Sequence, residues 1–140
     1  HWDLRGKGHR LYMESTASVA HTNFSLWSSW LPAQYYNGRL FAGTRARQKP
    51  LTWRFVFTLG SPLIPAVRLW RIWAGLPSKE LKGRFLRCIH SMVIGLAVDG
   101  VGQMIGYACG AGNALERVGK YEMDRFRHVR EQDRIDILGA

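Results

Sequence analysis

The sequence predicts a mainly helical chain with two short strands near its start. Glycines end a first helix near residue 8, and short extended segments follow at 10–14 and 18–21. An aromatic and basic segment at 25–50 then has the apolar spacing of an amphipathic helix. Two long apolar blocks, 53–73 and 85–112, are interpreted as further helices.

The basic charge is concentrated in the first part of the chain. The formal net charge of the 140 residues is +10. Residues 1–84 contain 13 Lys and Arg against 3 Asp and Glu, whereas residues 85–140 contain 7 of each kind. A positive field of this kind attracts nucleic acid or anionic lipid headgroups.

The start of the chain and its two cysteines restrict the kind of protein that this sequence can be. The sequence begins with His1 and lacks the pattern of a signal peptide, so we interpret it as the C-terminal fragment of a longer protein. Cys88 and Cys109 lie in apolar surroundings without a C-x-x-C spacing. They are expected to be buried free thiols, because neither a disulfide scaffold nor a zinc site fits this spacing.

Residues 25–50 are predicted to form an amphipathic basic helix. Ser28 or Ser29 is expected to cap it, with Pro32 in the first turn, where a missing N–H costs little. Basic residues gather in its C-terminal half, which is the favourable end for cations. Tryptophans and tyrosines beside arginines also suit a lipid headgroup interface.

Residues 51–112 are predicted to be an apolar, membrane-associated helical region. Its first charge-free core, 55–67, has 13 residues, which is short of the roughly 20 needed to cross a bilayer, and Pro62 and Pro65 interrupt it. This pattern predicts a broken helix that lies in one leaflet, with a buried helix of a soluble core as the alternative. The residues expected at the membrane interface are Trp53, Arg54, Arg68, Trp70, Arg71 and Trp73.

The second apolar block, 85–112, combines a glycine repeat with one carboxylate. Gly102, Gly106 and Gly110 recur every fourth residue, which permits close contact with another helix. Asp99 at the centre of a bilayer would cost about 2.5–3.5 kcal/mol. Either Asp99 therefore faces protein or water, or the block is a hairpin in the interface, and we favour the hairpin.

Residues 113–140 are predicted to form a C-terminal amphipathic helix and a tail. Asn113 and Glu116 have the spacing of a capping box. Glu116 and Lys120 are expected to form an i,i+4 ion pair.

The motifs Gly-Lys-Gly-His-Arg-Leu-Tyr-Met-Glu at 6–14 and Ala-Ser-Val-Ala-His at 17–21 resemble the end of the catalytic domain in family-2 glycosyltransferases. In that family a helix ends in glycine, a strand follows, and the next strand closes on Val-x-His. Later motifs are similar to a bacterial subgroup with a membrane-associated C-terminal extension; they lie at 23–25, 38–42, 45–47, 59–65 and 102–107. The resemblance implies that residues 1–24 are the C-terminal edge of a Rossmann-like α/β nucleotide-diphospho-sugar transferase domain.

The same resemblance implies an inverting glycosyltransferase at the cytoplasmic face of the cell membrane. Its donor would be a nucleotide-diphospho-sugar, its acceptor a saccharide or lipid-linked saccharide, and its cofactor a divalent Mn or Mg ion. His21 corresponds to the family histidine that binds the metal or the pyrophosphate; the alternative is a histidine satisfied at a strand end. The general base is expected upstream of His1, so this fragment contains no catalytic residue and is expected to be inactive alone.

Two other functions remain open from the sequence. A basic, aromatic protein can bind nucleic acid by stacking bases. However, the aromatic residues adjoin long apolar runs instead of alternating with Lys and Arg, which disfavours nucleic acid as the partner. The third interpretation is a membrane anchor without enzymatic activity.

Overall fold

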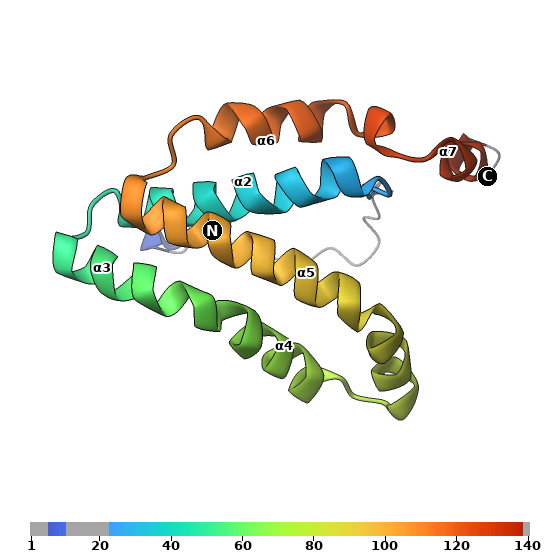
Figure 1. Cartoon of the computed structure of the whole chain (residues 1–140), viewed down its shortest axis with the longest axis horizontal. Helices are drawn as coiled ribbons and strands as arrows, with labels where there is room; N and C mark the ends of the chain where they lie inside the picture. The colour runs from blue at the N-terminus through green and yellow to red at the C-terminus, as the bar shows by residue number, and fades with distance from the viewer. Residues whose placement is uncertain (1–5, 11–22, 139–140) are drawn as a thin grey trace.

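The computed structural model describes residues 6–10 and 23–138, which form a row of packed helices (Figure 1). The long helix α5 lies between α2 on one side and a limb made of α3, η1 and α4 on the other. Helix α6 packs against α2 on the side away from α5. The elements are α2 (Trp27–Ala46), α3 (Leu51–Gly60), η1 (Ser61–Leu63), α4 (Ile64–Gly75), α5 (Lys79–Cys109), α6 (Ala114–Met123), η2 (Arg125–His128) and α7 (Glu131–Leu138).

The predicted edge of an α/β domain is wrong for the part of the chain that the structure describes. Over 6–10 and 23–138 the backbone forms helices and turns and no strand, so this part is all α. Residues 11–22, which carry most of the two expected strands, lie outside the described residues. Just before α2, the amides of Ser25 and Leu26 donate to the His128 carbonyl at 3.2 and 3.3 Å, so these groups are bonded to the end of η2 and not to a strand.

The contact between α2 and α5 is built on residues with small or no side chains. A Cβ atom added to Gly102 of α5 would lie 2.1 Å from the carbonyl oxygen of Tyr35, and one added to Gly38 of α2 would lie 2.3 Å from the carbonyl oxygen of Asp99. Only glycine fits such an approach of two backbones. The buried face of α2 is accordingly small: Ser29, Ala33, Gly38, Ala42, Gly43 and Ala46.

The glycine repeat in α5 therefore has the role expected of it at two of its three positions. Gly102 and Gly106 both face α2, where a Cβ on Gly106 would lie 2.5 Å from the carbonyl oxygen of Arg39. Gly110 instead ends α5, with a φ of 82° in the left-handed region. Glycine is favoured there because other residues are strained at positive φ.

Helix α2 begins earlier than its sequence suggests. Its N-cap is Leu26, which makes no side-chain cap, so Ser28 and Ser29 lie inside the helix and Pro32 lies beyond its first turn. The Ser29 hydroxyl is hydrogen-bonded at 2.8 Å to Nδ1 of His128, a residue 99 positions further along the chain. A tertiary contact has thus taken the side chain that was expected to cap the helix.

Helix α5 runs without interruption for 31 residues, so the predicted hairpin in 85–112 is wrong. Its start is capped by Ser78, whose hydroxyl accepts from the amide of Leu81 at 3.2 Å. Cys88 and Cys109 are free but exposed, in contrast to the expected burial. Both lie on α5, and the faces that α5 buries against its neighbours are occupied by glycines and a few polar and aromatic residues.

Two arginines from other helices bind the carbonyl end of α5. Arg54 of α3 donates from Nε to the Tyr107 carbonyl at 2.9 Å and from Nη2 to the Ala108 carbonyl at 2.6 Å. Arg39 of α2 donates from Nε to the Gly110 carbonyl at 3.2 Å. The last carbonyls of a helix lack partners within it and carry partial negative charge, so cations are favourable there.

The limb is a helix broken once, as the two prolines predict. Residues Ser61–Leu63 form a 3₁₀ turn between α3 and α4. The limb is attached to α5 through aromatic rings: Trp53 stacks on Phe57 with centroids 3.9 Å apart, and both rings lie against Tyr107 at 5.6 and 5.3 Å. Tyr107 is 1% exposed, so this contact forms part of the small buried core.

Helix α6 confirms one of its two predicted local interactions. Glu116 and Lys120 form the expected i,i+4 pair, with 2.9 Å between the carboxylate oxygen and the ammonium nitrogen. The hydrogen bond and charge of Lys120 lower the pKa of the Glu116 carboxyl. Asn113 is the N-cap residue of α6 but makes no side-chain cap hydrogen bond.

We expect Gly102→Ala and Gly83→Ala to have opposite effects on stability, although both replace a glycine inside α5. At Gly102 the new methyl group overlaps the Tyr35 carbonyl, so the free energy of unfolding should fall by about 1–3 kcal/mol. At Gly83 nothing lies within 4 Å of the added Cβ, so the better helix propensity of alanine should raise the free energy of unfolding by about 0.5–1 kcal/mol. Denaturant unfolding in mild detergent, followed by circular dichroism, measures both; equal effects would contradict the close contact.

Candidate functional site

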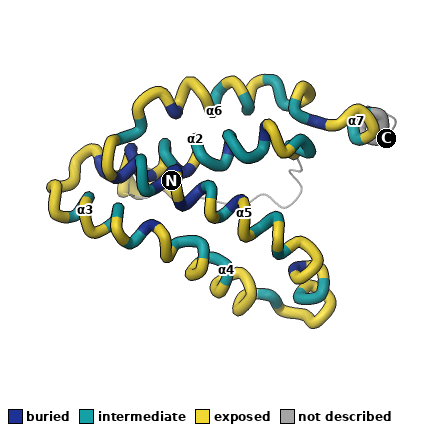
Figure 2. Tube along the Cα trace, viewed as in Figure 1, coloured by how far each residue is buried: buried dark blue, intermediate teal, exposed yellow. Residues whose placement is uncertain are grey.

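The limb exposes large apolar side chains. Helices α3 and α4 contain no buried residue, and Figure 2 shows the limb mostly in the colour of exposed residues. Contiguous exposed apolar patches mark contact with a membrane or a partner protein. More than half of each of the following side chains is exposed: Leu51, Phe55, Val56, Leu59, Leu63, Val67 and Trp70.

Within the described part of the chain, α5 is the helix that is long and apolar enough to cross a membrane. Its 31 residues extend roughly 46 Å at 1.5 Å per residue, against a hydrocarbon thickness of about 30 Å. Its most apolar window has a mean hydropathy of 1.4, and 28% of that window is buried. The core helix of a soluble protein is mostly buried, so α5 differs from such a helix in its exposure.

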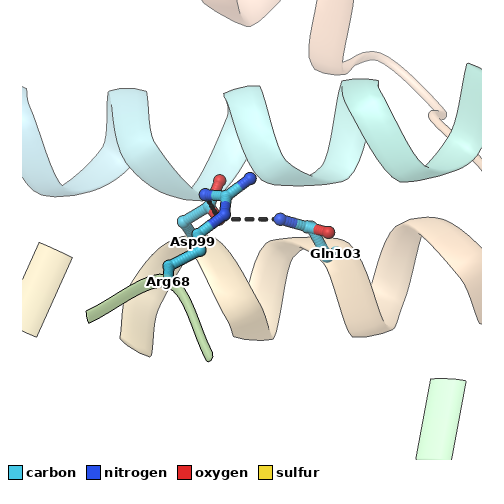
Figure 3. Close-up of polar contacts among 3 residues, drawn as sticks. All are labelled: Arg68, Asp99 and Gln103. Carbon is cyan, nitrogen blue, oxygen red and sulfur yellow. Dashed lines mark hydrogen bonds and ion pairs between the residues drawn. The ribbon is translucent and has the colours of Figure 1, made fainter. Parts of the chain in front are cut away.

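A polar cluster connects α4 to the middle of α5 (Figure 3). Oδ2 of Asp99 accepts from Nη1 of Arg68 and from Nε2 of Gln103, each at 2.7 Å. The Asp99 side chain is 10% exposed and that of Arg68 is 42% exposed. Asp99 therefore faces protein, and its buried charge is both paired and hydrogen-bonded, as a carboxylate in apolar surroundings requires.

A groove runs between the limb and the pair of α2 and α5. Its volume is about 430 Å³, and its walls are largely apolar. Arginines enter it from two sides, Arg45 from α2 and Arg68 and Arg71 from α4. The other lining residues are Phe41, Val56, Phe57, Gly60, Leu63, Ile64, Val67, Gln103 and Tyr107.

The structure divides the residues expected at the membrane interface into two groups. Trp53 and Arg54 are directed into the protein, the first onto Phe57 and Tyr107 and the second onto the end of α5. Arg68 is half-exposed and paired with Asp99.

The other three predicted interface residues are exposed on α4. Trp70 is 68% exposed, and Arg71 is exposed beside it. Trp73 is 38% exposed, with Phe85 at 5.7 Å and the Lys82 ammonium 5.2 Å from its ring centroid. His21, the expected metal or pyrophosphate ligand, lies outside the described residues.

The interface residues predicted from the sequence do not include the apolar stripe on the limb, although residues 55–67 are expected to lie in one leaflet. Phe55, Leu59, Leu63 and Val67 follow one another at intervals of four residues, which places them along one side of a helix. Periodicity alone does not distinguish a stripe that packs on protein from one that faces lipid. The exposure of these four side chains shows that the described part of the chain does not cover the stripe.

The described residues do not fit a metal site. Across 6–10 and 23–138, no three His, Cys, Asp or Glu side chains are grouped so that they could hold a metal ion. The divalent ion implied by the sequence resemblance therefore has no site in this part of the chain.

Comparisons with known proteins identify no relative. No protein-family model matches the sequence, and neither the curated proteins nor the solved structures give a significant match.

We expect Arg68 and Asp99 to be coupled more strongly than an exposed pair of the same geometry. In a double-mutant cycle of Arg68→Gln and Asp99→Asn, the coupling energy should be about 1–3 kcal/mol because Asp99 is buried. The matched control is Arg84 with Glu80, also 2.7 Å apart but exposed on both sides, where about 0.3–0.5 kcal/mol is expected. Equal coupling energies from chemical denaturation would show that burial adds nothing.

Proposed function

We propose that this chain is the membrane-associating C-terminal part of a family-2-like, inverting glycosyltransferase. The enzyme would move a sugar from a nucleotide-diphospho-sugar to a saccharide or lipid-linked acceptor at the cytoplasmic face of the cell membrane. Two independent arguments support this proposal. The geometry of the limb supports the membrane association, and the motifs of residues 6–21 support the enzyme class.

The exposed apolar limb is the observation on which the membrane proposal rests. Fully burying one Leu side chain contributes about 1.5–3 kcal/mol, so a surface with Leu59, Leu63 and Trp70 exposed gains considerably from an apolar medium. In this arrangement the limb lies in the interface and its outer side chains enter the hydrocarbon, while α5 and α2 hold it in place. Trp70 and Arg71 lie where the headgroups begin.

Part of the basic charge is already used inside the molecule. Arg39 and Arg54 bind the end of α5, and Arg68 is paired with Asp99. Exposed cations such as Arg47 and Arg71 remain for anionic headgroups, each contributing about 1 kcal/mol near such a surface. Attraction to the membrane by charge is therefore expected to be weaker than the net charge of +10 suggests.

The enzyme proposal depends on residues that carry the family resemblance. The helix-ending glycine, the segment 10–14 and the Val-x-His at 19–21 resemble motifs of nucleotide-diphospho-sugar transferases. The divalent Mn or Mg ion that the resemblance implies would supply positive charge to the departing diphosphate. In this proposal His21 binds that ion or the pyrophosphate.

We expect the triple variant Leu59→Gln, Leu63→Gln, Trp70→Gln to lose vesicle binding. Phosphatidylglycerol vesicles are mixed with the protein and floated on a density gradient, once at low salt and once at about 1 M salt. At about 1 M salt, electrostatic attraction between charges more than roughly 3 Å apart is screened. The bound fraction should fall about tenfold or more at both salt concentrations, because burial of apolar surface is not screened.

The matched control for this experiment replaces equally exposed apolar residues on the opposite edge of the row. Leu115→Gln, Met123→Gln and Phe126→Gln change side chains that are 69%, 90% and 48% exposed. This variant should float like the unmodified chain. If both triple variants lose binding equally, or if the unmodified chain stays monomeric without detergent and ignores vesicles, the limb is not a membrane surface.

We expect His21→Ala to lower kcat in the protein that carries the transferase domain. Loss of one group that stabilises developing charge commonly reduces the rate about 10²–10³-fold. Sugar transfer from labelled nucleotide sugars, measured at saturating Mn or Mg, tests this, with His9→Ala as a neighbouring control. Unchanged turnover would mean that His21 is only a structural residue, and transfer by the 140-residue chain alone would place the catalytic base within it.

A further inference from the structure

The groove between the limb and α5 has the dimensions and walls of a ligand site for a chain-like apolar molecule. It is lined along the limb from Val56 to Arg71, which corresponds to about 22 Å of helix at 1.5 Å per residue. Its volume of about 430 Å³ falls within the range of small-molecule sites. The apolar walls come from both sides, with Phe41 on α2 and Val67 on α4.

The charge of the groove has one sign. Three arginines line it, and no carboxylate does. Within the described residues, Arg45 and Arg71 form no ion pair, and Arg45 lies 5.3 Å from the centroid of the Phe41 ring. Guanidinium groups bind phosphate oxygens through paired N–H donors.

Asp99 fixes one of these guanidinium groups without using up its donors. It accepts one hydrogen bond from Arg68, through Nη1, whereas a guanidinium has five N–H donors. The same carboxylate oxygen holds the amide of Gln103, which also lines the groove. Asp99 thus orients two polar side chains at the groove while it lies behind them.

The groove opens onto the exposed apolar limb. Val56, Leu63 and Val67 line the groove and are 64%, 66% and 51% exposed. An occupant can therefore enter from the same medium that covers the limb.

We infer that the groove binds one anionic phospholipid of the bilayer, with an acyl chain along its apolar walls and the phosphate against Arg71 and Arg68. This inference rests on the proposed membrane association. A lipid bound in this site would hold the limb at the level of the headgroups, in addition to the general contact between apolar side chains and the bilayer.

The test uses the 140-residue chain in nonionic detergent and two short-chain probes. Dioctanoyl phosphatidylglycerol and dioctanoyl phosphatidylcholine have the same acyl chains, and their binding is measured by calorimetric titration. We expect phosphatidylglycerol to bind at least about fivefold more tightly. Arg71→Gln should weaken its binding about fivefold, the equivalent of one cation beside an anionic group, and should leave phosphatidylcholine almost unchanged.

Two matched controls separate the groove from the general surface. Arg87→Gln removes an exposed arginine of α5 that does not line the groove, so it should change neither affinity. Gly60→Leu adds a side chain at the groove, and Gly75→Leu adds one at the last residue of α4, outside it; neither added Cβ meets an atom within 4 Å. Gly60→Leu should lower the affinity for both lipids about tenfold, whereas Gly75→Leu should change neither affinity. Circular dichroism confirms the fold of each variant.

Three results would overturn the inference. Equal affinities for the two lipids would show that the arginines do not select an anionic headgroup. Equal effects of Arg71→Gln and Arg87→Gln would show that the preference comes from general surface charge and not from the groove. Binding of inorganic phosphate that depends on Arg71 but is unaffected by Gly60→Leu would assign the arginines to free phosphate. If flotation of the unmodified chain persists in any of these cases, the membrane association stands and only the lipid site falls.

Discussion

The approach of two backbones at the crossing of α2 and α5 is the constraint on which the structure depends. Gly38 of α2 lies against the Asp99 carbonyl of α5, and Gly102 of α5 lies against the Tyr35 carbonyl of α2. This proximity brings Arg39 within reach of the Gly110 carbonyl, so α2 both packs along α5 and binds its end. A larger side chain at either glycine would separate the helices and remove these contacts together.

The limb is held to α5 through aromatic rings and arginine side chains. Aromatic rings around Tyr107 fix one end, Arg54 binds the last carbonyls of α5, and the Arg68–Asp99 pair fixes the middle. Aliphatic burial contributes little, since α3 and α4 bury no residue fully. A limb attached by directional contacts keeps its apolar side chains free for another medium, which is consistent with the proposed membrane association.

Features that depend on neighbouring residues could be predicted from the sequence, whereas contacts between distant residues could not. The break at Pro62, the close glycine face of Gly102 and Gly106, and the pair of Glu116 with Lys120 were all predictable, because each depends on residues near in sequence. The roles of Ser29 and Trp53 were not, because His128 and Tyr107 are distant in sequence. The hairpin was favoured because a carboxylate at the centre of a bilayer is costly. Asp99 instead faces protein, and its partner Arg68 lies 31 residues away on α4.

The separation of α2 and α5 along the chain has a consequence for biosynthesis. The whole limb is made between them, so the small-residue face of α2 waits for its partner until Gly102 and Gly106 have left the ribosome. During that interval the glycines of α2 have no packing partner, while the apolar limb is already available to a membrane. If the limb associates with a membrane as proposed, it is free to do so before the helix pair closes, and chains that terminate before about residue 100 would leave α2 without its partner helix.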